Sequence, residues 1–291
     1  MASSRPTSTA PLFFDSFGGA APGPRQSAMW EKYGNHFSSR QACDEFFSYM
    51  ITPASSRWAF RPVGKTATTA ALSTLFHLEF GSPLTADLND PDDINEKPML
   101  HRLTWHGVFR RLIARDDYRP DTYLNDNLYI ATVRNPCSRA VSGFRYLCES
   151  QKRQHKAFAP ERSRLCAATG FDWNKHANTP EGFQRFLDYI AMSIGQSQGM
   201  LVNGHWRPQT DIIRPDLFRP DLVGRAENLG EFFHSLAEHL GNREFAAEAV
   251  AKNYLNAQPK VDISSFIEYP GTRQRLRDCY SNDFEEFGYD I

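Results

Sequence analysis

Three times along the 291-residue chain, a short apolar run is followed at once by a pattern typical of a helix. Alternation of strands with helices favours a parallel sheet with helices packed on it, so we expect an α/β fold. The pairs, each given as strand and then helix, are 57–63 with 67–80, 127–133 with 138–148, and 221–223 with 227–240.

Two of the expected helices have clear ends as well as regular spacing. Apolar residues recur every three or four positions across residues 229–240, and Gly241 follows as a stop signal. The same spacing runs across residues 183–194, behind Thr179 as a cap and Pro180 in the first turn. Both segments are predicted to pack one face against the core.

The length and the hydrophobic content of 41% suit one large domain. Residues 1–50 are turn-rich at first and then aromatic, which predicts an extension with a helical lead-in that packs on the domain. Residues 51–291 are expected to form the domain itself. Within it, residues 81–121 have a surface-loop composition and are a candidate acceptor-binding or lid region.

Charge and cysteine content limit which binding partners and which cellular compartment we expect. Lysine and arginine total 33 against 34 acidic residues, so no overall positive field attracts nucleic acid. The five cysteines are an odd number without a C-x-x-C pair, which disfavours a zinc site and a disulfide framework. With no apolar run of 18 residues at the N-terminus, we expect no membrane anchor and a cytoplasmic location.

A phosphate site is indicated between the first expected strand and its helix. Gly64 lets the backbone approach a ligand, and the first amides of the helix lack intrahelical partners and attract an anion. Lys65 and the nearby threonine hydroxyls complete the shell. A Walker A loop needs a glycine where Ala59 stands, so the Gly-Lys-Thr triplet alone is weak evidence for an NTPase. The structural alternative is that Thr66 caps the helix and Lys65 is solvated.

A second anion site is indicated where the buried strand 127–133 ends. Arg134 follows at the carboxyl edge of the sheet, where open α/β folds bind ligands. Ser142 lies on the polar side of the next helix, and an arginine with a serine can recognise a ribose phosphate. We expect Arg139 to brace the loop. The alternative is an arginine–carboxylate pair that ties the strand to the helix.

These motifs resemble those of the sulfotransferase superfamily, in particular the carbohydrate sulfotransferase branch called family 2. Residues 62–69, Pro-Val-Gly-Lys-Thr-Ala-Thr-Thr, are similar to its 5'-phosphosulfate loop. Residues 133–144 match its 3'-phosphate motif, R-[DN]-P-x-x-R-x-x-S-x-[FY], which is highly specific. Residues 205–209, 223–229 and 280–289 are similar to further family segments.

The resemblance implies a P-loop NTPase-like three-layer α/β domain with a central, mainly parallel sheet. It also implies transfer of a sulfuryl group, without a metal, from 3'-phosphoadenosine 5'-phosphosulfate (PAPS) to a hydroxyl or amine. The acceptor is expected to be a carbohydrate or glycoconjugate, and the chain is compatible with a homodimer. The residues expected to hold the donor are Gly64, Lys65, Thr66, Ala67, Thr68, Thr69, Arg134 and Ser142.

Catalysis needs a cation for the transferred group and a base for the acceptor proton. Lys65 is the expected cation. His106 is our first candidate for the base, since it lies between the two phosphate motifs where related enzymes place a catalytic histidine. His101 is a nearby alternative, His205 is second choice, and Glu79 stays open because some relatives use a glutamate. We expect Glu227 to hold structure at a helix start.

Two other classes of function remain open at this point. One is a nucleotide-binding or carbohydrate-binding protein that keeps the fold but has lost turnover. The other is a kinase or P-loop NTPase, which predicts magnesium-dependent hydrolysis of a nucleoside triphosphate.

Overall fold

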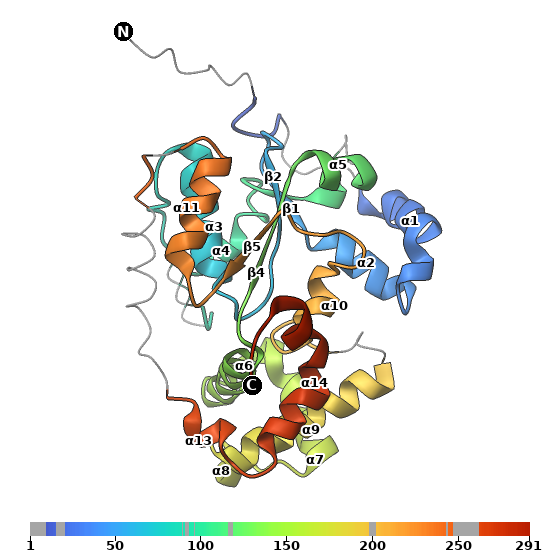
Figure 1. The fold of residues 1–291 in the computed structure, drawn as a ribbon, viewed down its shortest axis with the longest axis vertical. Helices are drawn as coiled ribbons and strands as arrows, with labels where there is room; N and C mark the ends of the chain where they lie inside the picture. Colours follow the sequence, from blue (N-terminus) through green and yellow to red (C-terminus); the bar gives the residue numbers. More distant parts are fainter. Residues whose placement is uncertain are drawn as a thin grey trace.

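The computed structural model describes residues 10–15, 21–88, 90, 93–95, 97–115, 119–197, 202–242, 244–246 and 262–291. Within these residues a five-stranded sheet runs in the order β3-β1-β2-β4-β5 (Figure 1). The strands are β1 (Ile51–Thr52), β2 (Trp58–Arg61), β3 (Arg110–Arg111), β4 (Leu128–Val133) and β5 (Leu222–Arg225).

Strands β2, β4 and β5 are parallel neighbours and form the part of the sheet that the sequence predicts; Trp58 in β2 pairs with Leu128 in β4. Each of these strands leads into a helix: α3 (Thr68–Phe80), α6 (Pro136–Lys152) and α11 (Leu229–His239). The predicted alternation of strands and helices is therefore confirmed, with bounds that differ by a few residues.

Strands β1 and β3 extend the sheet at one edge and run antiparallel to their neighbours. Ile51 in β1 pairs with Phe60 on one side and with Arg111 in β3 on the other. Each strand has two residues, too few to show the alternating pattern by which a sequence reveals a strand. The sheet is thus mixed, with a parallel centre.

Helices cover both faces of the sheet (Figure 1). Helices α3, α4 (Pro98–Arg102) and α11 lie on one face, over Trp58 and Phe60. Helices α1 (Pro22–Tyr33), α2 (Arg40–Ser48) and α5 (Pro120–Asp126) lie on the other, where Ala59 and Tyr129 point. Side chains alternate between faces along a strand, which is why neighbours in β2 enter different cores.

The expected helical lead-in is present in α1 and α2. Met29 and Phe47 from these helices share a buried cluster with Ala59 and Tyr129 of the sheet. The helices before residue 50 therefore pack on the same core as the strands that follow. In the part of the chain that the structure describes, no helix has the length and apolar content of a membrane span.

A second layer of helices packs below the carboxyl edge of the sheet (Figure 1). Its members besides α6 are α7 (Ala159–Thr169), α8 (Trp173–His176), α9 (Pro180–Ser197), α13 (Ser264–Ile267) and α14 (Thr272–Phe287). Gly182 N donates to Thr179 Oγ1 at 3.1 Å, as the predicted cap requires, and Gly241 after α11 has φ 74°.

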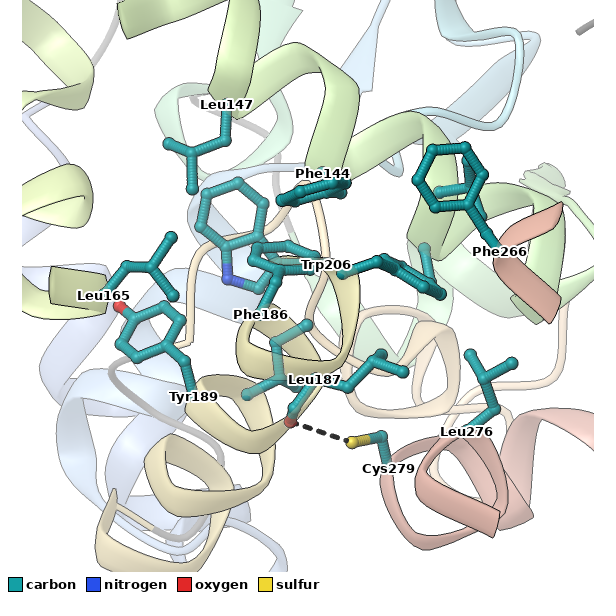
Figure 2. Packing of buried hydrophobic residues seen from close by; sticks show 14 of the residues in the cluster. Phe144, Leu147, Leu165, Phe186, Leu187, Tyr189, Trp206, Phe266, Leu276 and Cys279 are labelled. Atoms are coloured by element: carbon teal, nitrogen blue, oxygen red, sulfur yellow. Dashed lines mark hydrogen bonds between the residues drawn. The ribbon is translucent and has the colours of Figure 1, made fainter. Parts of the chain in front are cut away.

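Figure 2 shows the core of this helical layer. The Phe186 ring lies 5.5 Å from Phe144 and 5.2 Å from Trp206, centroid to centroid, and all three side chains are fully buried. Burial of each such ring contributes about 1.5–3 kcal/mol. Trp206 is thereby fixed, and with it the backbone of the segment 203–207 that faces the sheet.

The remaining short elements connect these layers. Helix α10 (Gln209–Ile213) precedes β5, and single turns of 3₁₀ helix occur at η1 (Gly34–His36), η2 (Leu112–Ala114) and η3 (Lys156–Phe158). The candidate acceptor region 81–121 contains α4, β3 and η2 rather than a plain loop.

Candidate active site

The loop between β2 and α3 has an unusual backbone. Lys65 has φ 67° and Ala67 has φ 63°, both in the left-handed region that side chains disfavour. A Cβ at Gly64 would lie 2.9 Å from both Gly204 O and His205 Cα, so only glycine fits there. The loop is therefore pressed against the segment 204–205, at the edge of the sheet where ligands bind.

The threonine hydroxyls mainly hold the loop together. Thr66 Oγ1 donates to Val63 O at 2.8 Å and pairs with Thr132 Oγ1 of β4 at 2.7 Å, while Thr68 Oγ1 donates to Val63 O at 2.5 Å. The N-cap of α3 is Ala67, so Thr66 is not the helix cap. An anion at this loop would meet the free backbone amides of the first turn of α3.

Lys65 folds over an aromatic ring. Its Nζ lies 3.2 Å from the centroid of Tyr146 in α6, and the side chain is half-buried rather than solvated. Burial lowers the pKa of Lys65 to about 7, and the nearby Arg134 cation adds to this effect. A negative charge placed beside Lys65 and Arg134 would offset both the cost of burying the ammonium and its repulsion by the guanidinium.

Arg134 is held in place by its main chain and by its side chain. Its backbone N donates to Gln209 Oε1 at 2.8 Å, and its O accepts from Gln209 Nε2 at 2.9 Å. Its Nε donates to Ser138 Oγ at 2.9 Å. Among the described residues no carboxylate forms an ion pair with this guanidinium, although the Glu227 carboxylate is near enough to oppose the lowering of the Arg134 pKa by burial. Ser142 is half-buried one turn beyond Ser138.

Asp283 and Asn135 fix the residues that surround Arg134. Gln209 is itself fixed by Asp283 of α14, whose Oδ2 accepts from Gln209 N at 2.8 Å and from Nε2 at 3.2 Å. Asn135 Oδ1 caps α6 by accepting from Cys137 N and Ser138 N. The strand end that presents Arg134 is therefore a rigid platform.

The two strand ends meet. Arg134 Nη1 lies 3.5 Å from Lys65 O, at the limit of a hydrogen bond. Arg139, which is 1% exposed, donates from Nε to Gly64 O, from Nη2 to Gly204 O and from Nη1 to Arg207 O, at 3.0, 3.0 and 2.7 Å. It braces the loop as the sequence predicts, and it joins three segments that lie far apart in the chain.

Comparison with protein families found one whose model matches the sequence of this chain. The sequence model of the sulfotransferase family matches residues 44–290, which include both strand ends, the segment 203–209 and α14. The chain belongs to the sulfotransferase family. Comparison with curated proteins and with solved structures found no match.

Two histidines of this sulfotransferase contact the loop. His101 Nε2 lies 3.0 Å from Thr69 Oγ1 in the first turn of α3. His205 Nδ1 lies 2.8 Å from Asn203 Oδ1. Because an amide oxygen only accepts, Nδ1 of His205 carries the proton and Nε2 keeps its lone pair.

The two histidines differ in their surroundings, and therefore in their pKa values. Burial, and then the Lys65 cation, lower the pKa of His205 to about 3, so it is neutral but weakly basic. Burial, and to a smaller extent the Lys65 cation, also lower the pKa of His101, but there the Asp93 carboxylate partly opposes the shift. His101 is therefore the better placed of the two to accept a proton near neutral pH.

The remaining candidates for the base, His106 and Glu79, occupy other positions than His101 and His205. His106 is exposed on the turn after α4, where its backbone N bonds to Arg102 O at 3.1 Å. Glu79 is buried at the far end of α3 and accepts from Trp58 Nε1 at 3.2 Å. At 1.5 Å per residue, that position is about 16 Å along the helix from Thr68. Glu227 holds structure: its Oε1 accepts from Asn135 N at 2.7 Å.

Several residues of the site were not predicted from the sequence. Gln209 was recognised only as part of a family-like segment, and the roles of Asp283, Tyr146 and Asn135 were not identified. Asn135 had a usable signal, since an asparagine before proline at a helix start is a common cap. In the described residues, no cluster of three or more His, Cys, Asp or Glu side chains is arranged to hold a metal ion.

Proposed function

We propose that this sulfotransferase transfers the sulfuryl group of PAPS to a hydroxyl or amine of a carbohydrate or glycoconjugate. The observation that supports this most is that the strand ends bearing Lys65, after β2, and Arg134, after β4, meet: Arg134 Nη1 lies 3.5 Å from the backbone O of Lys65. No described carboxylate pairs with either cation. Such a pair suits a ligand with an anion at each end.

The residues fit the donor at both ends. The first turn of α3, with Lys65, would hold its phosphosulfate, and Arg134 with Ser142 would hold its 3'-phosphate. Arg134 offers Nη2 and much of Nη1 to such a ligand, since its Nε is bonded to Ser138. When bound, the donor supplies an activated sulfuryl group, whose bond to the phosphate breaks as the acceptor oxygen or nitrogen bonds to sulfur.

Residues of this chain would provide the rest of the chemistry. Lys65 stabilises negative charge on the transferred group and on the leaving phosphate. His101 takes the proton of the acceptor, because it lies against the loop and the Asp93 carboxylate partly offsets the lowering of its pKa by burial. We prefer it to His106 and His205 on this geometry. The five cysteines are free thiols, which supports our placement of the reaction in a reducing compartment, the cytoplasm.

Calorimetry on the whole chain tests donor recognition. We expect adenosine 3',5'-bisphosphate to bind at least about 30-fold more tightly than adenosine 5'-monophosphate, since the 3'-phosphate has its own cation. Tighter binding of magnesium ATP, with hydrolysis, would identify an NTPase instead. Transfer of label from [³⁵S]PAPS to a panel of saccharides then separates an enzyme from a protein that only binds the nucleotide.

Three matched variants, His101→Gln, His205→Gln and His106→Gln, identify the base. We expect His101→Gln to lower kcat by about 10²–10⁴-fold with unchanged affinity for the bisphosphate. His106→Gln should keep most of the activity. If instead His106→Gln abolishes turnover while His101→Gln retains it, the assignment passes to His106.

A further inference from the structure

Tyr146 lies beside Lys65, and neither phosphate site uses it. It belongs to α6, four residues after Ser142 and eight after Ser138, so the three side chains form one stripe along the helix. The N-terminal end of this stripe contacts Arg134 through Ser138 Oγ. Its C-terminal end contacts Lys65, whose Nζ lies 3.2 Å from the centroid of the Tyr146 ring. One helix face thus reaches both cations of the site.

The ring of Tyr146 is itself held on two sides. His205 stacks on it with centroids 5.0 Å apart and planes 14° apart, and Phe158 meets it edge-on at 5.2 Å. Phe158 also contacts His205 at 5.3 Å, and Asn203 fixes His205 from behind. Together these contacts leave the Tyr146 ring little freedom to rotate away from Lys65.

Lys65 needs a partner that does not neutralise it. It has no ion pair with a described carboxylate, and Arg134 repels it. A carboxylate would bind the ammonium but would also cancel the charge that an incoming sulfonate requires. The face of an aromatic ring attracts the cation and leaves its charge available. Burial raises the pKa of Tyr146 to about 12, so the phenol itself stays neutral.

We propose that Tyr146 is a positioning residue for Lys65, whose ring face holds the ammonium over the loop, ready for the transferred group. This inference rests on the proposed function in one respect: Lys65 must act in sulfuryl transfer for its position to affect turnover. The hydroxyl of Tyr146 has no part in it.

Two variants separate the ring face from the hydroxyl. Tyr146→Phe keeps the face, and we expect kcat within about twofold of the wild type. Tyr146→Leu removes the face, and we expect kcat to fall at least about tenfold, with the affinity for adenosine 3',5'-bisphosphate unchanged. The alkaline limb of the kcat profile should move to lower pH, because the cation loses stabilisation. Tyr146→Met gives the same comparison if the leucine variant does not fold.

Phe37→Leu is the matched control. It removes a ring that lies 4.6 Å from the Arg214 guanidinium on the α1–α2 side of the fold, so the same kind of contact is lost away from Lys65. We expect no change in kcat. Equal kcat and equal pH profiles for the wild type and Tyr146→Leu would overturn the inference.

A second readout needs no turnover. In the whole chain with lysines ¹³C-methylated, the Lys65 methyl signal should be shifted upfield by the ring, in the wild type and in Tyr146→Phe. The shift should vanish in Tyr146→Leu. If it is present but the protein transfers no sulfuryl group, the proposed function fails and the contact stands. If transfer occurs and the shift is absent, the inference about Tyr146 fails alone.

Discussion

The end of β2 and the end of β4 meet at one site but are built differently. After β4, side chains fix the main chain: Gln209 bonds to both the N and the O of Arg134, and Asn135 caps the next helix. After β2, the loop takes two left-handed residues and is held from outside by Arg139. One end is a rigid platform that presents a cation, and the other is a strained loop that presents backbone amides.

This difference suits two tasks. A phosphate that only has to be recognised is served by a fixed guanidinium, which loses little freedom on binding. A group that changes charge during reaction is served by amides and a lysine already aimed at it. The contrast therefore predicts that damage to β4 affects affinity and damage to β2 affects turnover.

The largest effect should come from Arg139, the residue that joins the two ends. Replacing it by methionine leaves Gly64 O, Gly204 O and Arg207 O without their donor, at a cost of about 3–5 kcal/mol in the free energy of unfolding. Urea denaturation measures the loss. Arg145→Met, on the exposed side of the same helix, should stay within about 0.5 kcal/mol. Equal stabilities for the two variants would contradict this role for Arg139.

Lys65→Met should have the next largest effect, and on turnover. Removal of one preorganised donor to a developing charge costs about 2.7–4 kcal/mol, or about 10²–10³ in kcat. Affinity for adenosine 3',5'-bisphosphate, which lacks the sulfonate, should fall by at most about tenfold. Single-turnover transfer and calorimetry give the two values. Lys152→Met at the end of α6 is the control, and a loss confined to affinity would reverse the contrast.

The β4 end should show the opposite pattern. Arg134→Ala should weaken binding of the bisphosphate by about 2 kcal/mol, which is about 30-fold, and leave adenosine 5'-monophosphate unaffected. Gln209→Met should act in the same direction, since it frees the main chain of Arg134. Calorimetry with both nucleotides tests this. Parallel losses for the two nucleotides would mean that these residues do not face the 3'-phosphate.

The smallest effect is a pH dependence of donor binding. The pKa of Lys65 is about 7 without a ligand, and an anion beside it raises that pKa. Binding must therefore take up a proton above pH 7, and affinity should decrease by up to about tenfold per pH unit there, while it is level below pH 6. Calorimetry at pH 8 in buffers of different ionisation enthalpy measures the uptake. Persistence of the uptake in Lys65→Met would assign it to another group.

Much of this site could be predicted from the sequence because its main parts are local. In a parallel sheet the carboxyl ends of neighbouring strands lie at one edge, so loops after β2 and β4 must be close. The glycine, lysine and arginine at those ends then indicate an anion. The bracing role of Arg139 was also predicted from the sequence.

What could not be predicted depends on contacts between distant segments. Gln209 lies 75 residues from Arg134 and 74 from Asp283, and neither pairing leaves a local pattern. The contact between the Lys65 ammonium and the Tyr146 ring also joins residues that lie far apart in the sequence. The choice between His101, in the five-residue helix α4, and His106, on the turn after it, depends on which of them packs against the loop, and spacing does not decide that. Strands β1 and β3 were too short to recognise.

The position of Asp283 has a consequence for biosynthesis. The carboxylate that steadies Gln209, and through it Arg134, belongs to the last helix, and Tyr280 of the same helix donates to Trp206 O at 2.7 Å. A nascent chain that already contains β2, β4 and both phosphate motifs therefore has the residues that bind the nucleotide without the residues that hold them in place. We expect nascent chains that end before residue 283 to be unable to retain the nucleotide, because they lack the carboxylate that supports Gln209 and Arg134.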